Sequence, residues 1–148
     1  MPEDGTLPDG PRIGRRRVVV AVRTKSWLER TREACVFCRM IDTGHGRPTD
    51  WEQHGQKLYS FTPLNPVTPG HRLFIPHRHE PSANMSPVLT GELFQEAAQW
   101  GARRHEQFNL IINSGKHATQ TVFHLHAHYV PRTEGDGLAL PWTGQNHD

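Results

Sequence analysis

Cysteine is scarce in this sequence of 148 residues, which contains only Cys35 and Cys38. Two cysteines separated by two residues cannot build the disulfide framework of a small secreted domain. Reduced thiols are typical of proteins in a reducing compartment, so we expect a cytoplasmic protein.

Long apolar runs are also missing. The run from Val18 to Val22 follows three arginines but is very short. A signal peptide needs about 7 to 15 apolar residues and a helical membrane span about 20. We therefore expect a soluble protein that does not enter a membrane. The apolar fraction of 34% predicts a modest core.

A large excess of charge of one sign is absent, because the formal net charge is only +2. Such a small charge does not indicate a polyanion such as nucleic acid as the main partner. Basic residues still gather in the N-terminal part, at Arg15, Arg16, Arg17, Arg23, Lys25 and Arg30. We interpret them as a solvated basic arm. A nucleic-acid-binding module is an alternative, and it predicts an affinity that falls steeply with salt.

The order of apolar and turn-forming segments predicts one α+β domain. Residues 1–14 are rich in proline and glycine and predict a disordered tail, while 15–148 form a single domain. Strands are expected at residues 18–22, 58–62, 72–76, 108–113 and 121–130, and residues 43–57 are expected to form a loop. Too few helices connect these strands for a parallel sheet, so the sheet should be antiparallel.

Two helices are expected. Ser26 and Glu29 match a capping box, so a short N-terminal helix should run from there toward Cys35 or Ile41. Ser86 and the proline after it fit the N-cap and first residue of the main helix, whose apolar residues recur at helical spacing.

Three histidines alternate with apolar residues at His124, His126 and His128. Successive side chains of a strand point to opposite faces, so the histidines should share one face. Neutral imidazole is a nucleophile near pH 7, and imidazole is also the commonest metal ligand in proteins. The spacing alone leaves open whether this face attacks phosphorus or binds a metal ion.

The residues around these histidines resemble the signature of the histidine triad (HIT) family. Gln120 and Thr121 precede the pattern His-φ-His-φ-His-φ-φ at residues 124–130, and segments 65–71 and 75–79 are similar to a second landmark of that family. The resemblance covers residues 35–131. It implies a HIT-like antiparallel sheet with one main helix, an enzyme that cleaves nucleoside phosphates at the α-phosphate, a homodimer and no organic cofactor.

The resemblance also implies roles for individual residues. His126 would attack the α-phosphorus and form a nucleotidyl-histidine, which water or another acceptor then resolves. His128 would hold phosphate oxygens, with help from Asn113. Gln120 and Thr121 match the positions that bond the phosphate and assist the leaving group.

The resemblance also implies which residues would contact the base and the sugar of the substrate. Phe61 would contribute to an apolar pocket for the base. Pro63 stands where nucleoside-binding members place an acidic residue that bonds the ribose hydroxyls, and proline has no side-chain donor or acceptor. His71 matches a histidine at the edge of the site in some members, and no role is assigned to it. The base, the leaving group and the acceptor are not specified by the sequence.

The cysteine pair has the spacing of a zinc knuckle but lacks a second pair at finger distance. In a branch of the family that includes galactose uridylyltransferases, such a pair joins two histidines. That resemblance implies a structural zinc site formed by Cys35, Cys38, His79 and His124, with His77 as a competitor for His79. The alternative is two cysteines packed as small apolar groups, which would return His124 to the substrate.

A metalloenzyme of another class remains a further alternative. In that case the alternating histidines would hold a catalytic ion, and a chelator would abolish turnover at once. In the triad interpretation a chelator would loosen the fold, but the chemistry itself needs no metal.

Overall fold

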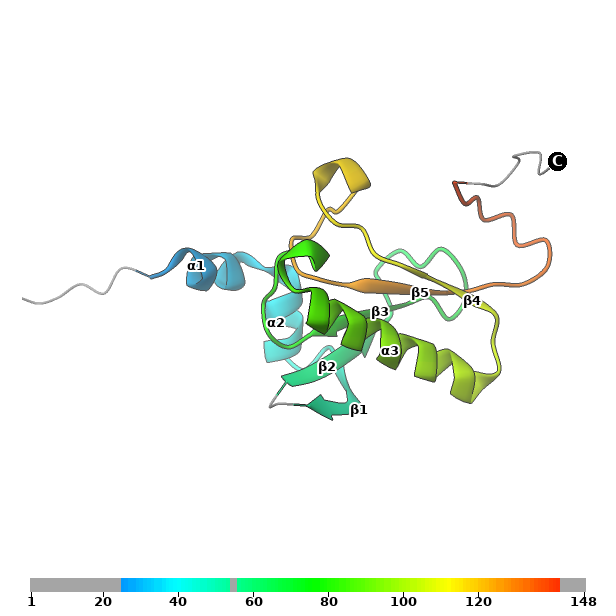
Figure 1. Ribbon diagram of the computed structural model, residues 1–148, viewed down its shortest axis with the longest axis horizontal. Helices are drawn as coiled ribbons and strands as arrows, with labels where there is room; N and C mark the ends of the chain where they lie inside the picture. The colour runs from blue at the N-terminus through cyan, green and yellow to red at the C-terminus, as the bar shows by residue number, and fades with distance from the viewer. Residues whose placement is uncertain (1–24, 54–55, 142–148) are drawn as a thin grey trace, which may run out of the picture.

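The computed structural model describes residues 25–53 and 56–141 (Figure 1). The tail expected over residues 1–14 and the strand expected over 18–22 lie outside these ranges. The single domain over 15–148 therefore stays a prediction. No helix in the described part of the chain is both long enough and apolar enough to cross a membrane.

One antiparallel sheet forms the centre of the fold, with the strand order β1-β2-β3-β5-β4. Its strands are β1 (Arg47–Gln53), β2 (Gln56–Phe61), β3 (Arg72–Pro76), β4 (Phe108–Ile111) and β5 (Ala127–Pro131). Every neighbouring pair is antiparallel. The predicted α+β class is confirmed.

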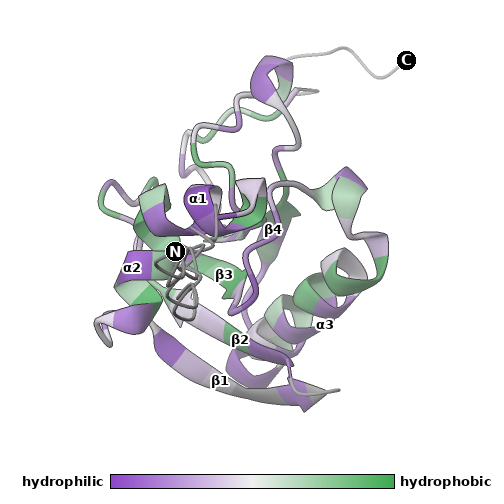
Figure 2. Ribbon diagram, turned by 90° about the vertical axis from the view of Figure 1, so that its left-hand side faces the viewer, coloured by the Kyte–Doolittle hydropathy of each residue, from purple (hydrophilic) through white to green (hydrophobic). Residues whose placement is uncertain are grey.

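Helices cover both faces of the sheet (Figure 2). The helix α3 (Pro87–Arg104) lies on one face, and α2 (Val36–Asp42) lies on the other. The α3 face buries Leu58, Phe74, Leu89, Leu93, Ala97, Leu125, Ala127 and Tyr129. The α2 face buries Cys35, Phe37, Cys38, Ile41, Phe61, Leu73 and Ile75. Alternate residues of β3 thus contribute to different cores, as a pleated strand requires.

The short N-terminal helix begins as predicted but is interrupted. In α1 (Trp27–Ala34) the Glu29 backbone N–H donates to Ser26 Oγ at 3.1 Å, and the Ser26 N–H donates to the Glu29 carboxylate at 2.6 Å. This confirms the capping box. The helix ends at Ala34 with Cys35 as its C-cap, which agrees with the shorter of the two predicted ends. It does not continue to Ile41, because Cys35 has an extended backbone (φ −76°, ψ 122°) and α2 starts after it. The break turns the Cys35 and Cys38 sulfurs toward the same histidine.

The main helix begins at Pro87, as predicted, although Ser86 makes no side-chain capping bond. Two 3-10 turns complete the described helices, η1 (Ala83–Met85) and η2 (Lys116–Ala118). The second of them lies in the connection between β4 and β5.

The prediction of a loop over residues 43–57 is wrong for residues 47–53 and 56–57, which belong to strands. This segment contains β1 and the start of β2, which pair as an antiparallel hairpin with an irregular register between Pro48 and Glu52. The sequence hides β1 because an edge strand can stay hydrophilic while its backbone bonds to a neighbour. Figure 2 shows mostly hydrophilic residues along β1.

The strand expected over residues 121–130 is shorter in the structure. Regular pairing starts only at Ala127, because β3 pairs with β5 through residues 72–74 and 127–129. His124 and His126 precede the strand, and the Leu125 N–H bonds to the Glu80 carbonyl rather than to a ladder partner. The strand expected over 108–113 likewise ends earlier, at Ile111.

Candidate active site and metal centre

A cavity of about 730 Å³ opens on the α2 face of the sheet. Its polar lining includes Asn113, Thr121, His126 and His128. Its apolar wall is formed by Val36, Phe37, Met40, Phe61, Leu64, Leu73 and Val122. A mostly apolar lining with a few polar groups is typical of a site for a small ligand.

The ring of His126 is held by a hydrogen bond from one of its two nitrogens to the backbone. Its Nδ1 lies 2.7 Å from the His124 carbonyl oxygen, and a carbonyl can only accept, so Nδ1 carries the proton. The lone pair of neutral His126 is then on Nε2. Burial lowers the pKa of His126, while the bond to the His124 carbonyl opposes that shift. The ring is thus a neutral nucleophile near pH 7.

His128 is oriented by a second histidine. His71 Nδ1 accepts from the Val67 N–H at 3.1 Å, so neutral His71 has its proton on Nε2. That nitrogen lies 3.0 Å from His128 Nδ1 and donates to it. His128 must therefore carry its own proton on Nε2, where it can donate to an oxygen of a bound phosphate.

Gln120 and Asn113 are engaged by the protein itself. Gln120 is buried, its amide donates to the carbonyls of Pro81 and Val122, and it does not line the cavity. Asn113 lines the cavity, but its amide nitrogen donates to the Ala118 carbonyl and to Thr119 Oγ1. Both side chains order the connection between β4 and β5, which then presents Thr121 to the cavity.

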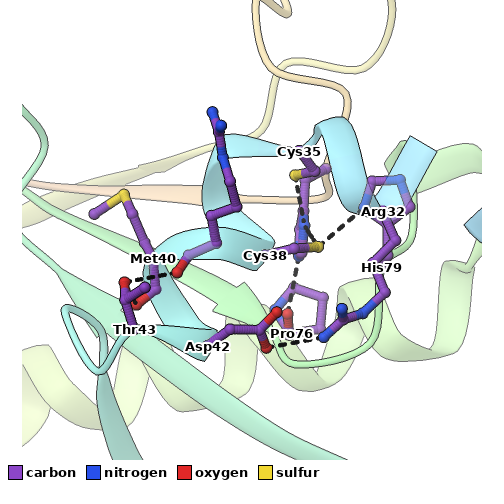
Figure 3. A network of polar contacts seen from close by, with 10 residues as sticks. Arg32, Cys35, Cys38, Met40, Asp42, Thr43, Pro76 and His79 are labelled. Atoms are coloured by element: carbon purple, nitrogen blue, oxygen red, sulfur yellow. Dashed lines mark hydrogen bonds and ion pairs between the residues drawn. The ribbon is translucent and has the colours of Figure 1, made fainter. Parts of the chain in front are cut away.

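A second cluster lies beside the cavity. The ligand atoms of Cys35, Cys38, His79 and His124 all lie within 4.8 Å of one another, and all four residues are buried. Figure 3 shows the two sulfurs close together, with His79 to one side. These side chains could hold a metal ion.

The distances within the cluster fit a tetrahedral ion. Cys35 Sγ and Cys38 Sγ each lie 3.4 Å from His124 Nδ1, and Cys38 Sγ lies 3.4 Å from His79 Nδ1. Zinc–sulfur and zinc–nitrogen bonds of usual length at a tetrahedral angle give a sulfur–nitrogen edge of about 3.5 Å. His124 Nε2 lies 2.9 Å from the Pro76 carbonyl and donates to it, which leaves Nδ1 as the ligand atom.

The two thiols of the cluster do not have equal acidity. A hydrogen bond from Cys38, together with His124, lowers the pKa of Cys35, whereas bonding to Cys35 and burial raise the pKa of Cys38. Without a bound cation, the protein thus favours ionisation of Cys35 but not of Cys38. A cation would favour ionisation of both thiols, because metal ligation requires deprotonated sulfur.

His79 joins the cysteines, whereas His77 does not. His77 is exposed, and its ring lies beside Tyr59 with ring centroids 5.8 Å apart and the ring planes tilted by 35°. After β3 ends at Pro76, residues 77 and 78 are exposed and residues 79 and 80 are buried, so the chain turns His79 inward and leaves His77 outside. The cluster has four protein ligand atoms, as closed structural sites do, and does not include His126 or His128. The structure therefore gives no support to a catalytic metal on all three histidines.

Sequence reasoning did not identify every residue of the site. His71 was left without a role, although it is 3% exposed and contacts His128 directly. Phe37 places its ring edge against His126 at a centroid distance of 5.3 Å, and Met40 and Leu73 also line the cavity. No sequence signal distinguishes these apolar residues from core residues.

The stability of the protein should depend on pH through His128. Burial, then the nearby His126 and His71, lower the pKa of His128 from 6.5 to about 4. Between these values the unfolded chain binds the proton more readily than the folded protein does. The contribution of His128 to the free energy of unfolding is therefore fully present above pH 6.5 and is lost as the pH falls through about 4. His128→Asn should flatten this part of the curve of urea midpoint against pH. A slope equally reduced by His117→Asn, at an exposed histidine, would contradict the assignment.

The fold and the two clusters define a class of small α+β proteins with a histidine-lined pocket. The HIT domain family model matches residues 48–135. Adenosine 5'-monophosphoramidase HNT1 of Saccharomyces cerevisiae is 31% identical over 118 residues, covering 78% of this chain and 73% of that protein. Adenylylsulfatase HINT3 of Arabidopsis thaliana is 32% identical, covering 70% and 55% respectively.

A solved structure agrees with these similarities. The zinc-bound histidine triad family protein of Mycobacterium smegmatis is 34% identical, with a TM-score of 0.53, and the match covers 73% of this chain and 81% of that one. The chain belongs to the HIT family. The predicted family and fold are confirmed.

Proposed function

We propose that this protein is a nucleotide hydrolase or nucleotidyl transferase that cleaves its substrate at the α-phosphate through a covalent intermediate on His126. The observation that carries the proposal is the tautomer of His126. Its Nδ1–H donates to the His124 carbonyl, and the residue lines the cavity. The names of the two enzyme relatives, a monophosphoramidase and an adenylylsulfatase, support a nucleotide substrate.

The reaction would proceed in two displacements. The lone pair of His126 Nε2 forms a bond to the α-phosphorus while the bond from phosphorus to the leaving group breaks. Water or another acceptor then attacks phosphorus and releases its proton to solvent, the bond from nitrogen to phosphorus breaks, and neutral His126 is regenerated. The Nε2–H of His128 would donate to a phosphate oxygen as negative charge grows there, and Thr121 would assist the departing group.

Trapping the intermediate tests this proposal. An adenylated amine is mixed with the protein, the reaction is quenched within milliseconds to seconds, and the intact mass is measured. We expect a mass increase of one nucleotidyl group, and peptide mapping should place it on His126. Turnover by wild-type protein with the adduct on another residue would reject the assignment.

We further propose that Cys35, Cys38, His79 and His124 hold a structural zinc ion. The donor set and the spacing of its atoms support this, as does the zinc-bound structure from Mycobacterium smegmatis. The ion would join the break between α1 and α2 to the segment that carries His126. It would supply cross-linking and no reaction step.

His71 should act as a positioning residue for His128. His71→Phe removes the donor to His128 Nδ1, so the His128 ring loses both its tautomer and its orientation. We expect kcat to fall by roughly 10- to 100-fold, as misplaced catalytic groups do, with a smaller change in KM. His71→Gln, which retains an N–H donor, should recover part of the loss. Equal kcat values for the two variants would argue against positioning through that bond.

The sugar of the substrate should be recognised weakly. The described residues that line the cavity include no aspartate or glutamate, and they include Pro63, which by the resemblance stands where nucleoside-binding members place an acidic residue. We expect kcat/KM for a 2'-deoxynucleotide substrate to lie within about tenfold of that for the ribonucleotide. A site built to bond a hydroxyl would discriminate by about 10⁴-fold or more. Pro63→Asp should increase the preference for ribose, and strong discrimination by wild type would refute this expectation.

The homodimer also remains a proposal. β4 is an edge strand of the described sheet, and its free side offers backbone groups for pairing with a second copy. The sedimentation coefficient of the purified chain would show whether it forms a dimer.

A further inference from the structure

A second cavity lies on the other face of the sheet, between the hairpin β1–β2 and the C-terminal half of α3. It measures about 250 Å³, and Arg72 on β3 is central to it. Arg72 follows His71 directly in the chain, and consecutive residues of a strand point to opposite faces. His71, just before β3, therefore contacts His128 on the α2 face, while Arg72, the first residue of β3, lines this second cavity.

No carboxylate of the described residues forms an ion pair with the guanidinium of Arg72. Its Nη2 donates to Ser60 Oγ at 2.9 Å, and its Cζ lies 4.7 Å from the centre of the Trp100 ring. Its Nε is buried without a hydrogen-bond partner.

The other charged groups around Arg72 are mostly positive. Arg47 and Arg103 line the same cavity, and the carboxylate in its wall, Glu96, is paired with Arg103 at 3.3 Å. Burial, then Arg47 and Arg104, lower the pKa of Arg72. A partly buried cation without a partner destabilises a fold unless an anion compensates it.

We propose that this cavity binds a phosphate group, either as the free ion or as a phosphomonoester. Three guanidinium groups against one carboxylate leave two positive charges, which a phosphate with a charge of about −2 balances better than a carboxylate does. Guanidinium groups match the oxygens of phosphate with paired N–H donors, and the Ser60 hydroxyl adds a further polar group. The site is separate from the histidine pocket and does not depend on its chemistry.

Trp100 allows the site to be observed directly. Its indole N–H signal is followed by nuclear magnetic resonance while inorganic phosphate is added at constant ionic strength, with chloride as the compensating ion. The signal is assigned with Trp100→Phe. A saturable shift is expected in wild type and in His126→Ala, because the histidine pocket faces away from this tryptophan.

Two substitutions should weaken this binding. We expect Arg47→Gln and Arg72→Gln each to raise the dissociation constant for phosphate at least about tenfold, the usual loss for one charge-assisted contact. Arg39→Gln, at an exposed arginine of α2, removes the same charge outside the cavity and should have little effect. Arg47 is exposed, so its variant remains informative if Arg72→Gln does not fold.

Phenyl phosphate is the second probe, since its ring can contact Trp100. Tighter binding of phenyl phosphate than of inorganic phosphate would identify a phosphomonoester as the ligand, and equal binding would identify the free ion. The absence of a saturable Trp100 shift with both probes overturns the proposal. Equal weakening in the Arg39→Gln control overturns it as well, because binding would then follow overall charge rather than this cavity.

Discussion

Replacing His126 with alanine is expected to lower turnover by roughly four to six orders of magnitude, which is the loss seen when a catalytic nucleophile is removed. The reason is that no other side chain in the cavity can take its place. His128, the nearest imidazole, has its Nδ1 occupied by His71 and its Nε2 protonated. The measurement is kcat under single-turnover and steady-state conditions with an adenylated amine.

A histidine outside the cavity provides the matched control for this substitution. His117→Ala removes an exposed histidine from η2 and should leave kcat within about twofold, since distant surface changes are usually mild. His126→Gly leaves room for free imidazole, which should restore part of the activity. If a folded His126→Ala protein retained wild-type kcat, the nucleophile would have to be another group.

Loss of the metal cluster should have the largest effect on stability. We expect Cys35→Ser to abolish zinc binding, measured by elemental analysis, and to destabilise the fold by roughly 4 kcal/mol or more. For a domain of this size that corresponds to about 10 to 20 °C in Tm. The physical reason is that the cluster joins the break between α1 and α2 to the segments that follow β3 and precede β5.

The two histidines after β3 allow a matched comparison of zinc content. His79→Ala should lose zinc, while His77→Ala should retain it with an almost unchanged Tm, because only His79 lies within the cluster. Equal zinc content in both variants would exclude His79 as a ligand.

Brief treatment with a chelator separates a structural ion from a catalytic one. We expect the initial rate to persist while the protein remains folded and to decline only as circular dichroism reports unfolding. Immediate loss of activity in a protein that is still folded would favour a metal-dependent reaction.

Local patterns were sufficient for several elements. The capping box at Ser26 and the proline at the start of α3 use bonds and dihedral limits that involve only neighbouring residues, so the sequence determines them. The apolar strand β3 was predicted with its observed bounds, because its burial on both faces produces a continuous apolar run. β1 was missed, because its pairing depends on backbone groups and leaves no apolar pattern.

The alternating histidines illustrate what a pattern cannot specify. The sequence predicted three equivalent side chains on one face of a strand, and the resemblance to the HIT family divided their roles. In the structure His124 precedes the strand and lies 3.4 Å from both cysteine sulfurs, while His126 and His128 line the cavity. This division arises from contacts with residues more than 80 positions away, at the break between α1 and α2.

The sequence by itself determined the family, the α+β class and the residue types of both clusters, because these follow from motifs and from local periodicity. Only the tertiary structure decided that His79 rather than His77 joins the cysteines, that Gln120 bonds the backbone, and that His71 sets the tautomer of His128. It also brought Arg72 together with Arg47 and Arg103 from three different elements. The physical reason is that proton positions and charge balance depend on which atoms meet across the fold, and residue order does not record that.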